Sequence, residues 1–216
     1  MLPSLTLTCS RLVRPHQLSG RLFLTVRRAS TTAQQVALPS GFELHPEFLN
    51  VDEQRTLLKA CLEKLDATDM RATRKLRRQY LASQPPTNEH AQIGSLFVPD
   101  EHYEFQQGHM DGVIRRYREM HVSSWPSSEE LKQVIEHVST LLPEGALQSG
   151  IQTHILHLAS DGYIDPHIDN IESSGSWILG VSLGDARDLV LEAQGQGDPC
   201  ERYRITLPSG SVYLQK

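Results

Sequence analysis

The segment IQTHILHLASDGYIDPHIDNIESSGSWILGVSLG, residues 151–184, determines the fold class, because the periodicity of the chain changes where it begins. Short runs rich in β-branched and apolar residues follow one another here. Gly, Asp and Pro separate them, a pattern typical of strands. The runs continue to the end of the chain as DLVLEA, RYRITL and SVYLQK. Helical patterns precede them. Helices followed by a run of strands predict an α+β fold, with the strands forming a sandwich or jelly roll.

Two amphipathic helices are predicted upstream of these strands. Asn50 is a candidate N-cap for the first, with Glu53 at the capping-box position. The second begins after Pro126, with Ser127 or Ser128 as its cap. The apolar residues at helical spacing are Leu57, Leu58, Cys61, Leu62 and Leu65 in the first helix, and Leu131, Val134, Ile135, Val138, Leu141 and Leu142 in the second. Each helix therefore presents one apolar side for packing.

The triplet His167–Ile168–Asp169 is the main candidate for chemistry. A His-x-acid pattern is weak by itself, because it occurs four times in this chain. Pro166 suits the first residue of a strand, so His167 and Asp169 would leave that strand on one face. An imidazole and a carboxylate so placed supply two of the three ligands of a non-haem Fe(II) oxygenase, and the third would be a His from a distant strand. The alternative is a His–Asp hydrogen bond on a strand surface.

Three segments carry a family resemblance: HILHLASDGYIDPHIDNIESSGSWILGVSLG, FLNVDEQRTLLKACLEKL upstream of it, and LPSGSVYLQ downstream. Together they resemble the AlkB family of Fe(II)- and 2-oxoglutarate-dependent dioxygenases, and its small mitochondrial branch most closely. The resemblance covers most of residues 41–216 and is patchy between 70 and 125. It implies a double-stranded β-helix, or jelly roll, with N-terminal helices packed on it. It also implies His167 and Asp169 as iron ligands and Tyr213 as a contact of 2-oxoglutarate.

The implied activity is hydroxylation or oxidative demethylation of a mitochondrial protein or RNA, with release of succinate and carbon dioxide. The branch is linked to programmed necrosis and fatty-acid metabolism. We expect a monomer without a membrane span. We also expect no efficient repair of methylated bases in duplex DNA, because base flipping needs stacking aromatics that the first 150 residues do not interleave with basic ones.

The sequence departs from the family pattern in two ways. Repair members bind 2-oxoglutarate through an Asn and a Tyr on the strand before the His-x-Asp motif, where this chain has Leu156 and Leu158. The mitochondrial branch also has apolar residues there. The family's third iron ligand, and the Arg residues that clamp 2-oxoglutarate, follow the Tyr by roughly a dozen residues or more, and the sequence ends at Lys216. We therefore expect a C-terminally shortened domain, poorly soluble and inactive in this form.

The N-terminal segment differs in composition from the rest of the chain. Residues 1–42 contain five Arg and no Asp, Glu or Lys, so the remainder carries a net charge of −10 although the whole chain carries −5. An Arg-rich, acid-free leader containing Ser, Thr and Leu is typical of a mitochondrial transit peptide. We interpret residues 1–40 as a transit peptide or disordered leader and residues 41–216 as the dioxygenase domain, located in the mitochondrial matrix. An ordinary basic tail is the alternative.

Two other functions remain open from the sequence. A catalytically inactive jelly-roll binding module would explain why two iron ligands stand without a third. An RNA-binding accessory protein would use the basic run at residues 71–78, where four Arg and one Lys crowd together. Such runs are more often solvated helix faces. The three cysteines are widely spaced and odd in number, which argues against a disulfide framework and suits a reducing compartment.

Overall fold

A computed structural model of the chain describes residues 4–11, 22–28, 38–85, 92–109, 112–146, 150–168, 176–193 and 201–216. Helices and antiparallel strands occur together in this part of the chain, so the predicted α+β class is confirmed. The helices are α1 (Val51–Thr68), α2 (Arg71–Ser83) and α3 (Glu129–Ser139), with the short 3-10 helices η1 (Ile93–Leu96) and η2 (Asp100–His102). The strands are β1 (Ser4–Arg11), β2 (Leu22–Arg28), β3 (Phe42–His45), β4 (Gln106–Gly108), β5 (Ile114–Val122), β6 (Ile151–His167), β7 (Ile178–Gly184), β8 (Arg187–Ala193), β9 (Glu201–Leu207) and β10 (Val212–Gln215).

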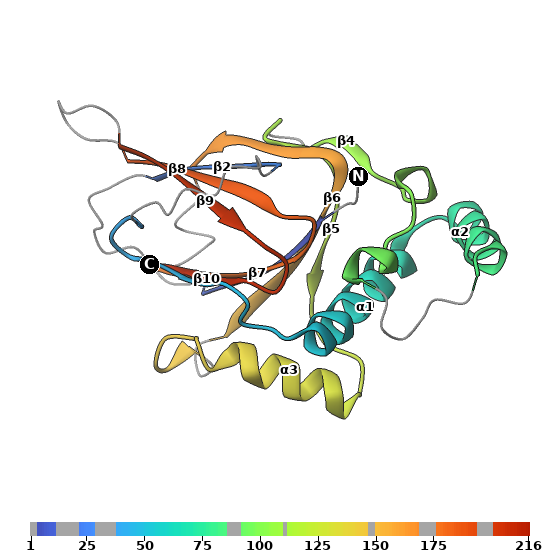
Figure 1. Cartoon of the computed structure of the whole chain (residues 1–216), viewed down its shortest axis with the longest axis horizontal. Helices are drawn as coiled ribbons and strands as arrows, with labels where there is room; N and C mark the ends of the chain where they lie inside the picture. Colours follow the sequence, from blue (N-terminus) through green and yellow to red (C-terminus); the bar gives the residue numbers. More distant parts are fainter. Residues whose placement is uncertain are drawn as a thin grey trace.

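The described strands form one hydrogen-bonded path in the order β3-β10-β7-β1-β6-β2-β8-β9, with β5 paired to β6 and β4 to β5. Every pair is antiparallel. The path curls, so that β2 and β8 lie on one side and β7 and β10 on the other (Figure 1). Strand β6 belongs to both sides, because its first half pairs with β1 and its last residues pair with β2.

Strand β6 is longer than the sequence predicts. The DG pair at residues 161–162 predicts a turn, and Pro166 predicts the start of a new strand. Both predictions are wrong, because β6 runs without a break from Ile151 to His167. His154, His157 and His167 therefore all lie on this one strand.

The turn-forming pair becomes a bend within β6. At Gly162 the strand lies against backbone atoms of Ala159 and Arg116, so closely that a side chain would not fit. The buried guanidinium of Arg187 donates to the carbonyl oxygens of Ala159 and Gly162, both at 2.9 Å. These bonds satisfy carbonyl groups that the bend removes from the regular ladder. Arg187 is distant in sequence, which is why the local turn pattern does not reveal the bend.

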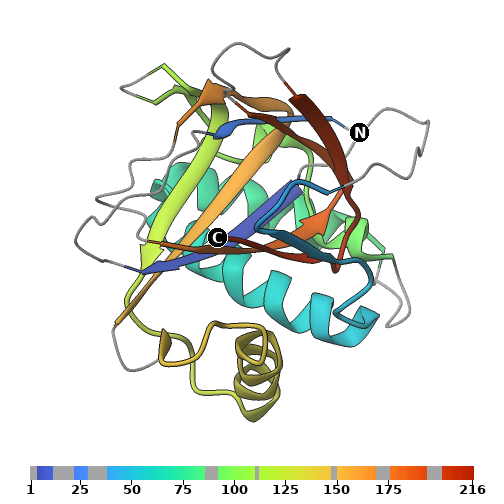
Figure 2. The ribbon, with the colours of Figure 1, turned by 90° about the vertical axis from the view of Figure 1, so that its left-hand side faces the viewer.

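The apolar core lies on both faces of the curled sheet. One cluster fills the space between the strands and helices α1 and α3; it includes Leu57, Leu58, Leu131, Val134 and Ile155. Figure 2 shows α1 lying across the strands, with α3 beside it. Two smaller clusters lie inside the curl and share Val26 of β2. Both faces of the central strands are therefore covered.

The predicted starts of α1 and α3 are confirmed. The side chain of Asn50 accepts hydrogen bonds from the backbone of Asp52 and Glu53, and the Glu53 carboxylate accepts one from the Asn50 N–H at 2.9 Å. This is the predicted capping box. Ser128 caps α3 by accepting from the Leu131 N–H. No helix in the described part is both long and apolar enough to cross a membrane.

The segment interpreted as a leader contributes two strands. In the sheet β1 lies between β6 and β7, and β2 lies between β6 and β8. Residues 4–11 and 22–28 are therefore paired with the rest of the sheet and not unstructured. Strand pairing does not test removal of the segment, so the transit peptide and the boundary at residue 40 stay predictions.

Candidate functional site

His167, the first predicted iron ligand, is the last residue of β6 and is partly buried. Its Nδ1 lies 3.0 Å from the backbone carbonyl oxygen of Asp165. A carbonyl oxygen can only accept, so Nδ1 carries the proton and the lone pair of the neutral ring is on Nε2. Histidines that bind metals are commonly oriented by such a bond to a backbone carbonyl. The ring is therefore in the tautomer that a metal bound at Nε2 requires.

Asp169, the second predicted ligand, lies outside the described residues. Within the residues that are described, no set of three His, Cys, Asp or Glu side chains is arranged to hold a metal ion. The described residues thus supply one predicted ligand, His167, in a tautomer that fits iron. The pairing of His167 with Asp169 stays a prediction.

Tyr213, predicted to contact 2-oxoglutarate, is buried on β10 between β3 and β7. Its ring stacks on Phe42, with 5.5 Å between the ring centroids. Gly180 is its partner on β7, and a side chain there would collide with the tyrosine ring. The ring packs in the cluster inside the curl. Strands β7 and β1 lie between β10 and β6, so Tyr213 and His167 are not on neighbouring strands. The contact with 2-oxoglutarate stays a prediction.

The two positions that bind 2-oxoglutarate in the repair members form an apolar wall in this chain. Leu156 and Leu158 are buried inside the curl with Tyr117 and Ile164. Leucine offers no hydrogen-bonding side-chain atom. The side chains at these positions therefore make this part of the interior apolar and cannot hydrogen-bond to a carboxylate.

A polar cluster that the sequence did not reveal lies on the same face of β5 and β6 as this wall. Glu119 is opposite Leu156, and His121 is opposite His154. The Glu119 carboxylate lies 3.1 Å from Nε2 of His154 and 3.7 Å from Nε2 of His109. His121 stacks on His154, with 4.8 Å between the ring centroids. Two imidazoles therefore contact one half-buried carboxylate, and a third stacks on one of them.

The electrostatic consequence is that Glu119 stays ionised. The hydrogen bond from His154 is the main cause that lowers the pKa of the Glu119 carboxyl, and the nearby imidazoles add to it against the effect of burial. The alternation Glu119-x-His121 on a strand was a weak signal in the sequence. His109 and His154 come from other elements, so only strand pairing brings them to it.

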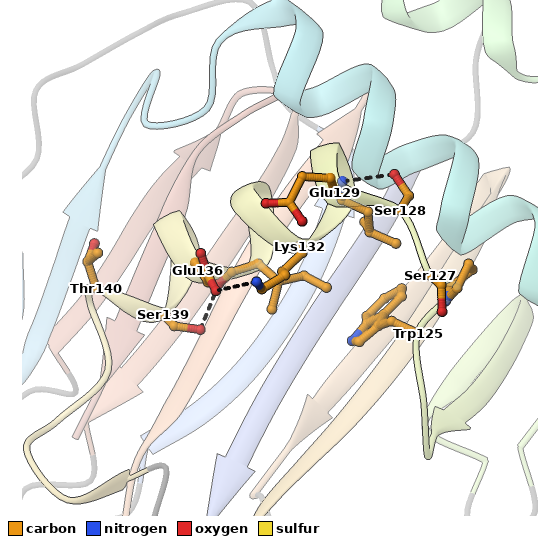
Figure 3. A pocket seen from close by; sticks show the side chains of 11 residues that line it. Trp125, Ser127, Ser128, Glu129, Lys132, Glu136, Ser139 and Thr140 are labelled. Carbon is orange, nitrogen blue, oxygen red and sulfur yellow. Dashed lines mark hydrogen bonds and ion pairs between the residues drawn. The ribbon is translucent and has the colours of Figure 1, made fainter.

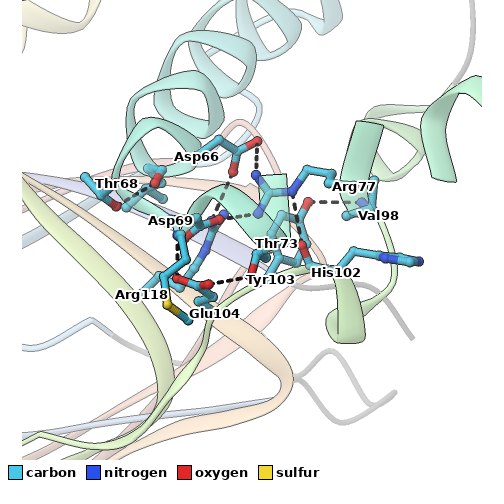
Figure 4. Close-up of polar contacts among 12 residues, drawn as sticks. Asp66, Thr68, Asp69, Thr73, Arg77, Val98, His102, Tyr103, Glu104 and Arg118 are labelled. Atoms are coloured by element: carbon cyan, nitrogen blue, oxygen red, sulfur yellow. Dashed lines mark hydrogen bonds and ion pairs between the residues drawn. The ribbon is translucent and has the colours of Figure 1, made fainter. Parts of the chain in front are cut away.

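The opposite face of β5 and β6 carries a buried charged network (Figure 4). Arg118 Nη1 donates to Asp69 at 2.8 Å and to Asp66 at 3.0 Å. Arg77 of α2 contacts the same two carboxylates, at 2.9 Å in the case of Asp66. Two carboxylates are thus matched by two guanidiniums. The network joins the end of α1, helix α2 and strand β5.

His157 adjoins this network and is fully buried. Its Nδ1 lies 3.0 Å from Nη2 of Arg118, so Nδ1 accepts and Nε2 carries the proton. The rings of Phe97, Tyr103 and Phe105 surround the imidazole, with centroids 4.9 to 5.4 Å away. Burial, followed by the charge of Arg118, lowers the pKa of His157 well below its ordinary value. His157 is therefore a neutral core residue and not a free base.

A groove of about 960 Å³ follows α3 and the loop before it (Figure 3). Trp125, Leu131 and Ile135 supply its apolar lining, and Lys132 and Glu136 lie at its polar side. The described lining residues all belong to the segment 125–140. The groove is therefore separate from the predicted site residues on β6 and β10.

Sequence comparison finds two proteins, both named as mitochondrial, that are similar to this chain. One is the bovine (Bos taurus) protein "Alpha-ketoglutarate-dependent dioxygenase alkB homolog 7, mitochondrial", 32% identical over 112 residues. The mouse (Mus musculus) protein of the same name is 28% identical over 110 residues. The chain is distantly similar to the mitochondrial AlkB homologue 7 dioxygenases. The resemblance drawn from the three sequence segments is thereby confirmed at this level.

The similarity is partial. Each match covers 51% of this chain and 48% of the relative, so the chain spans about half the length of these relatives. No family model and no solved structure matches the sequence. Both relatives are named as mitochondrial proteins. The location of this chain in the matrix stays a prediction.

Proposed function

We propose that this protein is an Fe(II)- and 2-oxoglutarate-dependent dioxygenase of the AlkB type that oxidises a mitochondrial protein or RNA. The observation that carries the proposal is the similarity to the two mitochondrial AlkB homologue 7 dioxygenases. The curled antiparallel strands support it, because a strand path with two facing sides linked by β6 is what a jelly roll requires. We therefore also propose that these strands are part of a double-stranded β-helix.

Each residue of the proposed site has a role that its chemistry allows. His167 would bind the metal through Nε2, held in orientation by the bond from Nδ1–H to the Asp165 carbonyl. Asp169 would add a carboxylate, and Tyr213 would contact 2-oxoglutarate. Leu156 and Leu158 would keep water from the reacting groups. Iron, when bound, would supply the chemistry in which dioxygen gives one oxygen atom to the substrate and the other to 2-oxoglutarate, which loses carbon dioxide and becomes succinate.

The test is Fe(II)-dependent formation of succinate from 2-oxoglutarate by the protein with its native termini. We expect turnover that His167→Ala abolishes. His102→Ala is the matched control, because the ring of this histidine packs against Tyr80 of α2 and lies outside the proposed site. An unchanged rate in His167→Ala would contradict the proposal. No turnover by the unsubstituted protein would support the inactive binding module instead.

A further inference from the structure

Helix α2 presents a row of positive charge on its outer face. Arg71, Arg74, Lys75 and Arg78 occupy positions i, i+3, i+4 and i+7, which share one side of a helix. We call these four residues the cationic stripe. All four are exposed. The helix lies at the outer edge of the molecule, beyond α1 (Figure 1).

The other side of α2 holds it to the protein. Arg77 binds Asp69 and donates to the carbonyl oxygen of His102 at 3.1 Å. Thr73 bonds to Glu104, and Tyr80 packs on His102 at 4.3 Å between ring centroids. These contacts fix the rotation of the helix about its axis. The cationic stripe therefore points away from the protein.

The cationic stripe works against the stability of its own helix. Arg71 and Arg74 lie in the first turn, where the helix dipole disfavours positive charge, and Met70 provides no side-chain cap. Like charges at i, i+3 and i, i+4 repel one another. None of the ion pairs between described residues includes any of the four. The cationic stripe therefore lowers the stability of α2 and has no acidic partner among the ion pairs described. Such a feature indicates a role in binding.

Exposed apolar side chains extend the stripe at both ends. Met70 is 67% exposed and precedes Arg74 by four residues, and Leu81 is 53% exposed and follows Arg78 by three. Both spacings place them beside the stripe. The phosphates of a nucleic acid gain nothing from contact with apolar side chains, and the bases stack on aromatic rings, which Met70 and Leu81 lack. The aromatic residue of α2, Tyr80, is already packed on His102. A bilayer interface, in contrast, takes up both cations and apolar side chains.

We infer that α2 is a docking face for the surface of an anionic phospholipid bilayer, with the cationic stripe at the headgroups and Met70 and Leu81 at their boundary with the acyl chains. This inference is independent of the proposed catalysis. The chain carries a net charge of −5, and without the four cations of the stripe the remaining residues carry −9, so on balance the rest of the molecule is repelled by such a surface. That repulsion orients the protein with α2 toward the lipid.

The experiment is co-sedimentation of the full chain with vesicles of phosphatidylcholine alone, or of equal parts phosphatidylcholine and phosphatidylglycerol. We expect the chain to bind the anionic vesicles and not the neutral ones, and we expect added salt to weaken this binding. Each cation near an anionic surface strengthens binding roughly fivefold, so Arg74→Gln combined with Arg78→Gln should weaken it about 30-fold. Leu81→Ser should weaken it in both low and high salt, because its contribution is not electrostatic.

The matched control removes two exposed cations elsewhere, Lys132→Gln on α3 and Arg202→Gln on β9. We expect its binding to be nearly unchanged, and thermal melting should show both double variants folded. Three results would overturn the inference: the same loss of vesicle binding in both double variants, equal binding of the unsubstituted chain to neutral and anionic vesicles, or no binding to either kind of vesicle. Arg74- and Arg78-dependent binding to a single-stranded RNA without binding to vesicles would also overturn it and would assign the stripe to nucleic acid.

Discussion

The two faces of strands β5 and β6 carry the same kinds of residue in opposite environments. On the helix side, His157 is fully buried, electrically neutral and bonded to Arg118. On the inner side, His154 is partly exposed and bonded to the carboxylate of Glu119. The residues are three apart on one strand. The difference shows that strand alternation and the elements packed on each face decide what a histidine does, whereas its sequence neighbours do not.

The charged groups of the two faces differ in the same way. On the helix side, Arg118 and Arg77 match Asp66 and Asp69 in a nearly closed network. On the inner side, the partners of Glu119 in the ion pairs described are the imidazole rings of His109 and His154 and not guanidinium groups. We therefore expect the helix side to matter most for stability, and the inner side to respond more to its surroundings.

Removal of Arg118 should have the largest effect. In Arg118→Ala the buried Asp69 loses one of its two guanidinium partners, and Nδ1 of His157 loses its donor. Breaking a buried charged network of this kind costs about 3–5 kcal/mol of unfolding free energy. Urea denaturation followed by circular dichroism measures the loss.

The matched control for Arg118→Ala is Arg116→Ala on the same strand. Arg116 pairs with Asp161, whose side chain is 66% exposed, so we expect a loss below about 1 kcal/mol. Similar losses for the two variants would show that the helix-side network is no more important than a surface pair.

Filling the space at Gly180 tests the packing inside the curl. A side chain there meets the ring of Tyr213, which is held by its stacking on Phe42. Gly180→Ala should therefore lower the unfolding free energy by about 1–3 kcal/mol, the usual cost of overpacking. The same substitution in a Tyr213→Leu background should cost less. An equal cost in both backgrounds would mean that the Tyr213 ring is not the obstacle.

The two faces should lose stability in different pH ranges. The pKa of His157 is lowered by folding, so the unfolded chain takes up a proton that the folded chain refuses, and stability falls as the pH drops below the unfolded value near 6.5. One such proton gives a slope of at most about 1.4 kcal/mol per pH unit. The pKa of Glu119 is also lowered, so its contribution is present above the unfolded value of 4.5 and is lost as the pH falls through the folded pKa.

Denaturation at a series of pH values separates these contributions. His157→Gln should flatten the slope of stability against pH between about pH 6 and 5, and Glu119→Gln should change that slope only below this range. A slope unchanged in His157→Gln would show that His157 does not carry the acid sensitivity of the helix side.

Local patterns predicted where helices α1 and α3 begin. The Asn50 capping box and the Ser128 cap need only neighbouring residues, and both formed as expected. The continuity of β6 escaped prediction, because it depends on Arg187 binding carbonyl groups 25 and 28 residues earlier. Asp161–Gly162 alone is a turn signal.

The candidate site shows the same division between local patterns, which the sequence reveals, and long-range contacts, which it does not. The local pattern placed His167 on a strand, which the structure bears out, although at the end of β6 and not at the start of a new strand. Glu119 and its imidazoles are assembled by pairing of β5 with β6 and by the end of β4, which spacing along the chain does not encode. Tyr213 lies inside the curl because Gly180 leaves room for it.

The central claim is that the end of β6 binds the iron of a dioxygenase, and anaerobic titration of the protein with Fe(II) tests it most directly. The protein should be prepared with its native termini. We expect saturable binding that His167→Ala and Asp169→Ala each weaken more than about 100-fold, since ligand loss exceeds the effect of changing a supporting residue. His102→Ala should bind as the unsubstituted protein does. Equal affinity in His167→Ala and the unsubstituted protein would contradict the claim.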